Sequence, residues 1–241
     1  MKDKMRQVVR ISLFAVGTLT ITAGLSRLAV AQNPELQQKV AELKQASAMN
    51  KQALAQYTWN QQVAISLKGE VKKTEHFQVQ LGPDGKPQKT SLDPPPQPPE
   101  HEGRLKKRIV EKKKEEYEDY ADQIKALIQQ YVPPEKDKIE QAYQAGNVMM
   151  GPAAGAPGEY RLVFTNYVKQ GDNMTIVMDK AQKNIVSLNI ATYLNDPGDA
   201  VKVNVQWARV PGGPNHVASE TIDGVSKQLT IATQNSNYQH M

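Results

Sequence analysis

The spacing of apolar residues near the start of the chain predicts a helix over residues 33–56. Asn33 suits the cap position, and Pro34 suits the first turn, where a missing N–H costs no hydrogen bond. The remaining positions are mainly Gln, Lys and Glu, so one side is wet. The apolar side recurs at steps of three and four and comprises Leu36, Val40, Leu43, Ala46, Met49, Ala53 and Leu54.

The period then changes to two, which is typical of strands with one buried face. From Tyr57 to Leu67 the apolar residues alternate with polar ones, and the pattern resumes from Val71 to Leu81 after Gly69. The segment 82–85 reads Gly-Pro-Asp-Gly, a strong turn signal. A third strand, Lys86 to Leu92, is therefore expected to return beside the second.

The middle of the chain reverts to helical spacing. Residues 93–99 are rich in proline and predict a short polyproline II connector. A long helix is predicted over 104–131, with a charged first half and an apolar stripe in the second. A shorter helix, Pro134 to Ala145, follows. Residues 147–158 are small, uncharged and rich in Gly and Pro, and predict a flexible loop.

The last third shows alternation interrupted by turns at regular intervals, as in a continuous antiparallel sheet. Together with the first three strands this gives about nine strands. The expected fold is a single α+β domain, residues 32–241, in which a curved antiparallel sheet is covered on one face by an N-terminal helix and a central helix pair. The predicted strands are Tyr160–Val168, Met174–Asp179, Ile185–Leu194, Val201–Val210, Val217–Ile222 and Lys227–Thr233.

Residues 1–31 have the three parts of a cleavable secretory signal peptide. A basic start precedes an apolar run from Ile11 to Leu25, and Ala29-Val30-Ala31 is a small-x-small cleavage pattern. A membrane span needs about 20 apolar residues, and this run is shorter. The mature chain is therefore expected to begin at Gln32, to be exported to the periplasm or beyond, and not to span the membrane.

Removing this leader changes the charge balance. The chain has 30 Lys and Arg against 25 Asp and Glu. Five of those bases and one acid lie in the leader, which leaves 25 against 24 in the mature part. A nucleic-acid partner is thus not expected, and no basic stripe with interleaved aromatics occurs. The absence of Cys excludes disulfides, thiolate metal sites and a lipid-anchored cysteine.

Motifs that would indicate catalysis are missing from the sequence. The four histidines, His76, His101, His216 and His240, have no metal-ligand spacing. Nucleophile elbows and phosphate-binding loops are absent, and Asp179, Asp196 and Asp199 fall in turns. We expect no enzyme, no cofactor and no metal.

Several short segments resemble those of an uncharacterised family of exported bacterial proteins. The resemblance is spread over nearly the whole mature chain and implies an exported compartment. The segments are Leu67–Lys72, Gly82–Thr90, Tyr131–Pro134, Asn189–Asp196 and Asn235–Tyr238.

The order of elements is also similar to that of the periplasmic lipoprotein carriers, the LolA-like half-barrels. That similarity concerns architecture, and the predicted strand number falls short of the usual one in that family. It implies an apolar cavity between sheet and helices that holds an acyl chain. The candidate lining residues are Trp59, Ile65, Phe77, Val79, Tyr117, Ile124, Met149 and Met150. The alternative to a binding site is that all eight are plain core.

Three hypotheses for the function stay open at this point. The first is a non-enzymatic periplasmic binding or carrier protein for a lipid or other apolar ligand. The second is a structural or interaction module of the envelope, which would bind an envelope protein through the charged helix 104–131 and the connector. The third is a hydrolase with an unrecognised site.

Overall fold

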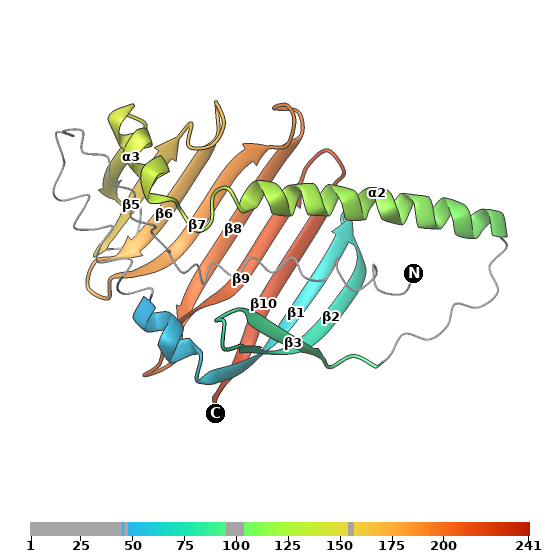
Figure 1. Cartoon of the computed structure of the whole chain (residues 1–241), viewed down its shortest axis with the longest axis horizontal. Helices are drawn as coiled ribbons and strands as arrows, with labels where there is room; N and C mark the ends of the chain where they lie inside the picture. Colours follow the sequence, from blue (N-terminus) through green and yellow to red (C-terminus); the bar gives the residue numbers. More distant parts are fainter. Residues whose placement is uncertain (1–44, 46–47, 95–103, 154–156) are drawn as a thin grey trace.

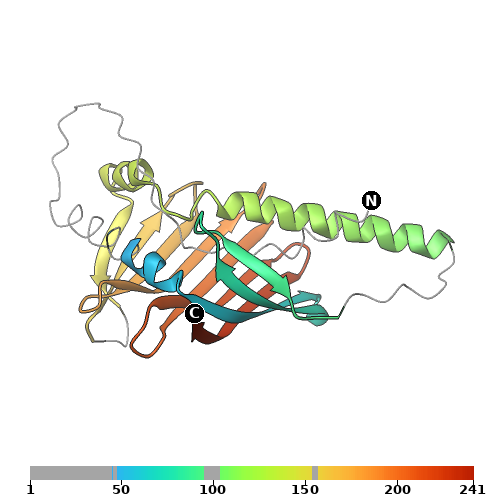
Figure 2. The same ribbon diagram turned by 60° about the horizontal axis from the view of Figure 1, so that its bottom comes forward.

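The computed structural model describes residues 45, 48–94, 104–153 and 157–241. Its centre is one curved sheet of ten antiparallel strands. The helices formed by residues 104–128 and 136–144 lie on one face of this sheet (Figure 1). This confirms the predicted α+β class, with one strand more than the nine expected. The face toward the helices is called the concave face here, and Figure 2 shows it from a second direction.

Apart from β4, where the sequence predicts a loop, the elements follow the chain in the predicted order, with boundaries within a few residues of those expected except at β10. After the helical residues 48–54, the chain contains β1 (Tyr57–Leu67), β2 (Glu70–Leu81), β3 (Pro87–Ser91), α2 (Arg104–Ile128), α3 (Lys136–Gln144), β4 (Val148–Pro152), β5 (Glu159–Thr165), β6 (Asn173–Asp179), β7 (Asn184–Tyr193), β8 (Ala200–Arg209), β9 (Asn215–Gly224) and β10 (Leu229–His240).

The strand order requires the chain to cross the sheet in its middle part. The sheet runs β3-β2-β1-β10-β9-β8-β7-β6-β5-β4, so β3 and β4 form its opposite edges. Nine spacings of about 4.8 Å separate them, or roughly 43 Å. The chain between β3 and β4 crosses this width partly through α2, whose 25 residues span about 37 Å at 1.5 Å per residue.

The pairing of β1 with β10 joins the two halves of the sheet. Tyr57 pairs with His240, and Leu67 with Leu229. The sequence pattern predicts that the last strand ends at Thr233, which is wrong. β10 continues to His240 although 234–240 is a polar segment, because the first half of β1 provides a partner for its backbone. Backbone pairing to a distant strand leaves no periodic apolar signal.

Residues 148–152 also differ from expectation. The sequence predicts a flexible loop here, and instead these residues form the edge strand β4, paired with β5 from Val148↔Phe164 to Pro152↔Tyr160. Pro152 at the strand end and Gly151 are tolerated because an edge strand has one unpaired side. The signal peptide, most of the helix predicted over 33–56 and most of the connector 93–99 lie outside the described residues.

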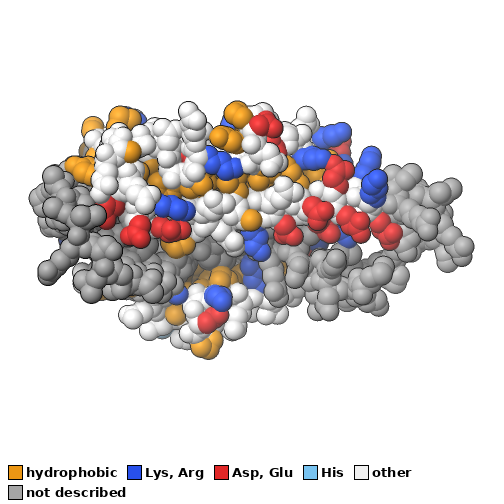
Figure 3. Space-filling view, turned by 45° about the horizontal axis from the view of Figure 1, so that its top comes forward, with side chains coloured by type: hydrophobic (Ala, Val, Ile, Leu, Met, Phe, Trp, Pro, Cys, Tyr) orange, Lys and Arg blue, Asp and Glu red, His pale blue; other side chains and the backbone are white. Residues whose placement is uncertain are grey.

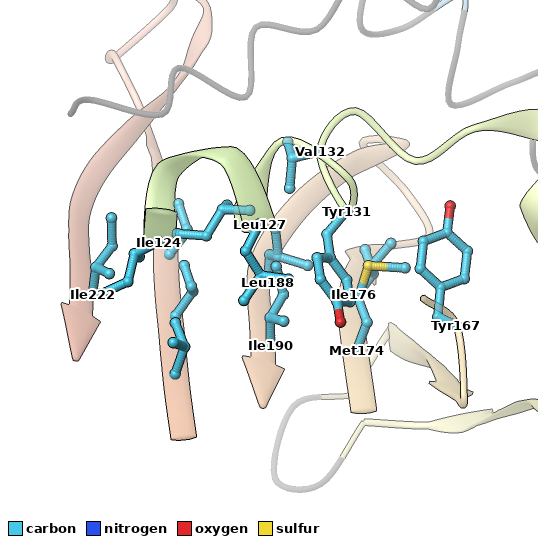
Figure 4. Close-up of a cluster of buried hydrophobic side chains, with 14 of the residues drawn as sticks. Ile124, Leu127, Tyr131, Val132, Tyr167, Met174, Ile176, Leu188, Ile190 and Ile222 are labelled. Carbon is cyan, nitrogen blue, oxygen red and sulfur yellow. The ribbon is translucent and has the colours of Figure 1, made fainter. Parts of the chain in front are cut away.

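The larger of two hydrophobic clusters lies between α2 and the concave face. Figure 4 shows Ile124 and Leu127 of α2, and Tyr131 just after it, directed at side chains from β6, β7 and β9. Ile124 and Ile128 have no exposed surface. Because the apolar stripe of α2 lies in its second half, that half packs on the sheet. In Figure 1 the first half extends past the edge formed by β2 and β3.

Two tyrosines fix α2 and the residues after it on the sheet. The Tyr131 hydroxyl donates to Asp172 Oδ2 at 2.6 Å and lies 2.6 Å from Thr192 Oγ1. Asp172 is buried, and its carboxylate also accepts the backbone N–H groups of 167, 168 and 169. The Tyr120 hydroxyl donates to Asp199 Oδ1 at 2.9 Å. These bonds hold α2 at one end of the strands.

Candidate functional site

A second, smaller hydrophobic cluster lies on the concave face at the opposite end of the strands. It is formed by Leu54, Trp59, Val79 and Leu81, with Tyr57, Phe77 and Tyr238 packed against it. Trp59 is stacked on Tyr238, with 5.4 Å between ring centroids. Leu54 ends the helical residues 48–54, so this short helix closes the small cluster in the way that α2 closes the large one.

α2 and the helical residues 48–54 lie at opposite ends of β9. Near α2, a Cβ added to Gly224 would lie 2.5 Å from Tyr120 Cε1, which shows how closely the helix approaches that end. At the other end, the Asn50 side chain donates to the Asn215 carbonyl at 2.7 Å and accepts the Asn215 N–H at 2.6 Å. The middle of the concave face lies between these two anchoring points.

Polar side chains occupy this middle region at positions where strand alternation points into the concave face. We call them the polar belt. Cross-strand pairing places some of them side by side in one row. Thr233 pairs with both Glu220 and Val63, and Val63 pairs with Glu75. In the next row Gln61 pairs with Asn235. The belt comprises Gln61, Glu75, Glu220, Thr233 and Asn235 and crosses β2, β1, β10 and β9.

Burial makes the belt unusual. Gln61 is 1% exposed, Glu220 and Thr233 are each 2% exposed, and Asn235 is 9% exposed. Carboxylates and amides are rarely buried this deeply unless they are hydrogen-bonded or have a specific task, because removing them from water is costly. The amides satisfy this rule. Gln61 Nε2 donates to Asn235 Oδ1 at 2.9 Å, and Asn235 Nδ2 donates to the Val217 carbonyl at 2.9 Å.

Two oxygen atoms of the belt accept no hydrogen bond from the described part of the chain. One is Thr233 Oγ1, and the other is Glu75 Oε2. The other carboxylate oxygen of Glu75 lies 2.6 Å from Lys73 Nζ. A buried acceptor without a donor loses about 1–3 kcal/mol relative to one that is paired. The belt therefore presents unmet hydrogen-bonding capacity between two apolar surfaces.

The candidate lining residues are divided among three places. Trp59 and Val79 are buried in the small cluster, and Ile124 is buried in the large one. Ile65 packs on the large cluster, whereas Phe77 touches both clusters and so bridges them beside the belt. These five residues line the concave face.

The other three candidates lie elsewhere. Tyr117 is half-buried on α2 and belongs to neither cluster. Met149 and Met150 are 61% and 46% exposed on β4. That strand forms one edge of the sheet, far from β1 and β2, and successive residues of a strand point to opposite faces. The structure therefore does not bring the methionine pair to the other candidates.

The belt residues are not among those predicted from the sequence, although the sequence contains a signal for them. Alternation in the first strand places Tyr57, Trp59 and Val63 on one face, and Gln61 lies on that same face. Thr233 likewise follows Leu229 at steps of two. A polar residue that replaces an apolar one within an otherwise regular inward series marks a buried polar position.

Acid and histidine chemistry elsewhere does not form a site comparable with the belt. His76 Nδ1 lies 2.9 Å from Asp93 Oδ1, and the His76 N–H donates to Asp93 Oδ2 at 2.7 Å. Asp93 thereby holds the chain after β3 against β2, and its pKa is lowered mainly by the backbone hydrogen bond from His76. The pair is largely exposed. Within the described residues, no three His, Asp or Glu side chains are arranged to hold a metal ion.

The exposed acidic and basic side chains on α2 form a charged surface of their own. Acidic and basic side chains gather along α2 (Figure 3), where Lys112 to Glu116 are exposed. Lys114 forms an ion pair with Glu118 at 3.8 Å, and Lys227, in the turn between β9 and β10, pairs with Glu116. Exposed pairs of this kind contribute little stability. In the described part of the chain, no helix has the length and apolarity needed to cross a bilayer.

Comparison with known proteins finds likeness in fold only. No protein-family model and no curated protein matches the chain. A crystal structure of a DUF1329 family protein from Desulfovibrio piger matches with 12% identity and a TM-score of 0.40, covering 83% of this chain and 92% of that one. A LolA superfamily protein from Nitrosomonas europaea matches with 8% identity and a TM-score of 0.36, covering 84% and 93%.

Proposed function

We propose that the protein is an exported, non-enzymatic binding or carrier protein that holds an amphipathic ligand on the concave face of its sheet. The observation that carries the proposal is the arrangement of this face. On β1 and β10 the large cluster lies toward one end of the strands and the small cluster toward the other, and polar belt residues stand between them. On β8 and β9 the large cluster continues to Val205, which pairs with Glu220, and to Val217. A sheet face that served as plain core would be expected to bury apolar side chains throughout.

Incompletely buried apolar side chains support the proposal. Ile65, Leu67, Phe77 and Trp207 pack against the large cluster, yet each keeps exposed surface. They belong to β1, β2 and β8. A ligand chain lying along this face would cover them, at a gain of about 25 cal/mol for each Å² of apolar surface removed from water.

A titration with 1-decanol tests the proposal. The chain has two Trp residues, Trp59 and Trp207. We expect a saturable change in Trp59 fluorescence in a Trp207→Phe background, because Trp59 lies in the small cluster beside Phe77. Phe77→Ala should weaken binding about tenfold, since truncating a large aromatic contact costs more than 1 kcal/mol.

The matched control is Gln78→Ala. Gln78 neighbours Phe77 on β2 but points to the opposite face and is exposed. It should leave decanol binding unchanged. Absence of saturable binding by the parent protein, or equal weakening by both variants, would contradict a ligand site on the concave face.

A second candidate function rests on the first half of α2. This half extends past the sheet edge in Figures 1 and 2 and has exposed charges of both signs at 112–116. It fits an interaction module that binds an envelope protein. Replacing residues 95–112 with a Gly/Ser linker of equal length should then abolish capture of that partner in a pull-down and shift Tm by no more than a few degrees. Capture that survives the replacement would exclude this surface.

A further inference from the structure

We infer that the polar belt binds the head group of the ligand and that this head group is a primary ammonium. The inference rests on the proposed carrier function and adds the chemical class of the ligand. Two features of the belt carry it: two acceptor oxygens that lack a donor in the described part of the chain, and the presence of two carboxylates among its five polar residues.

Two buried oxygen atoms of the belt lack a hydrogen-bond donor among the described residues. Thr233 Oγ1 and Glu75 Oε2 are buried and accept no hydrogen bond in the described structure. Both residues point into the concave face, because each is paired with Val63 across a strand boundary. Thr233 is 2% exposed. A donor that reaches these atoms must come from within the face, which is where the ligand would lie.

The spacing of these acceptors suits a small donor. Glu75 on β2 and Thr233 on β10 are two strand spacings apart, roughly 10 Å between backbones. Val63 of β1 lies between them in the same row, so one donor that serves both oxygens must lie above Val63 on the concave face. An ammonium has three N–H donors and can serve both oxygens.

The charge of the belt sets the sign of the head group. Glu75 and Glu220 provide two carboxylates within the belt. Two bases lie on the same face: Lys73 pairs with Glu75 Oε1, and Lys89 lies outside the belt with its Nζ 5.4 Å from the centroid of the Phe77 ring. Glu220 makes contacts of its own, so the inference takes hydrogen-bonding capacity from Glu75 and Thr233. A carboxylate or phosphate head group would bring a negative charge beside these acids and would supply no donor. A hydroxyl head group would satisfy one oxygen.

The apolar part of the ligand has a place on each side of the belt. Trp59 and Val79 lie on one side, Ile65 and Ile231 on the other. An alkyl chain attached to the ammonium would extend over one of these clusters. A short amine without a chain would gain the same hydrogen bonds and would lose the apolar contact.

The test compares head groups at constant chain length. Decylammonium, decanol and decanoate are titrated at pH 7 into the Trp207→Phe protein, with Trp59 fluorescence as the readout, and butylammonium serves as the arm without a long chain. We expect decylammonium to bind at least about tenfold more tightly than decanoate, because a charge-assisted hydrogen bond is replaced by repulsion. Butylammonium should bind far more weakly than decylammonium.

Variants locate the effect. Glu75→Gln and Thr233→Val are close in shape to the native residues and should reduce decylammonium affinity about five- to tenfold while leaving decanol affinity unchanged. Glu70→Gln removes the same charge from an exposed position of β2 and should change neither. Thermal unfolding of each variant verifies that it is folded.

The outcomes separate this inference from the function on which it rests. If decanoate binds as tightly as decylammonium, or if Glu75→Gln and Thr233→Val leave the preference intact, the ammonium assignment is wrong and the carrier function stands. If none of the long-chain probes binds to the parent protein, the carrier function itself fails.

Discussion

At the scale of single residues, the molecule uses buried polar groups in two different ways. Asp172 is fully partnered: it accepts hydrogen bonds from Tyr131 and from three backbone N–H groups. The belt residues Glu75 and Thr233 each keep an acceptor that lacks a donor. The first arrangement stabilises the fold, whereas the second leaves capacity for something outside it.

Tyr131→Phe tests the structural role of the first arrangement. The change removes a buried hydroxyl between Asp172 and Thr192 and should lower the free energy of unfolding by about 1–3 kcal/mol. Urea denaturation measures this. The half-buried Tyr117 of α2 provides the control, because Tyr117→Phe should change stability by less than about 0.5 kcal/mol. Equal effects of the two substitutions would contradict the role assigned to Tyr131.

His216 should make stability depend on pH. It is buried, its ring centroid lies 3.9 Å from that of Tyr238, and burial lowers its pKa below the usual value of about 6.5. As pH falls through 6.5, the unfolded chain takes up this proton before the folded chain does. The free energy of unfolding therefore decreases with falling pH.

The measurement is urea denaturation at pH 7.5 and at pH 5.5. His216→Gln should show a smaller loss of stability between these two values than the parent protein. His240→Gln, at the exposed end of the chain, should retain the full loss. A parental pH dependence that persists unchanged in His216→Gln would show that other groups cause it.

At the scale of elements, the close packing of α2 on β9 is the contact that sets the position of the helix. Gly224→Ala would place a methyl group 2.5 Å from Tyr120 Cε1 and 2.8 Å from Ile124 Cδ1. Relieving this overlap should cost about 1–3 kcal/mol. Gly151→Ala on β4 is the matched control, since a Cβ there meets nothing within 4 Å.

Thermal unfolding of both glycine variants gives the comparison. Gly224→Ala should lower Tm by several degrees, and Gly151→Ala should leave it nearly unchanged. If Gly224→Ala were as stable as the parent protein, α2 would lie farther from the sheet than this contact requires.

Periodicity was sufficient to predict most elements, and the exceptions have a common cause. The alternation in β1 and the three-four spacing in α2 are local signals that arise from one buried face. The end of β10 and the strand β4 lack such a signal. Their formation depends on pairing with β1 and β5, which lie far along the chain or across a turn.

The candidate site was predictable in part for the same reason. Trp59, Phe77 and Val79 could be identified because large apolar residues at inward positions stand out in the sequence. That β9, which carries Glu220, lies in the same part of the sheet as β1 and β2 follows from the order of strands, because this order joins β1 to the end of the chain. Gln61 could have been found from its place in the inward series, whereas the neighbours of Glu220 could not.

At the scale of the whole molecule, one face of the sheet is exposed to solvent. The other, concave face carries apolar clusters that are separated by polar residues along β1 and β10. On β1 and β10, the large cluster under α2 lies toward one end of the concave face, and the small cluster with helical residues 48–54 lies toward the other; on β8 and β9 the large cluster continues to Val205 and Val217. The belt lies between them. This division distinguishes the molecule from a sheet that is covered evenly by its helices, and it is the basis of the proposed carrier function.

Native mass spectrometry of the full chain, expressed with residues 1–31 as the expected leader and purified from the envelope fraction, tests the proposed carrier function most directly. We expect a mature protein accompanied by one co-purifying small amphipathic molecule, which is lost from Phe77→Ala and retained in Gln78→Ala. A mass equal to that of the bare mature chain, together with no uptake of decylammonium or decanol added afterwards, would contradict the carrier function.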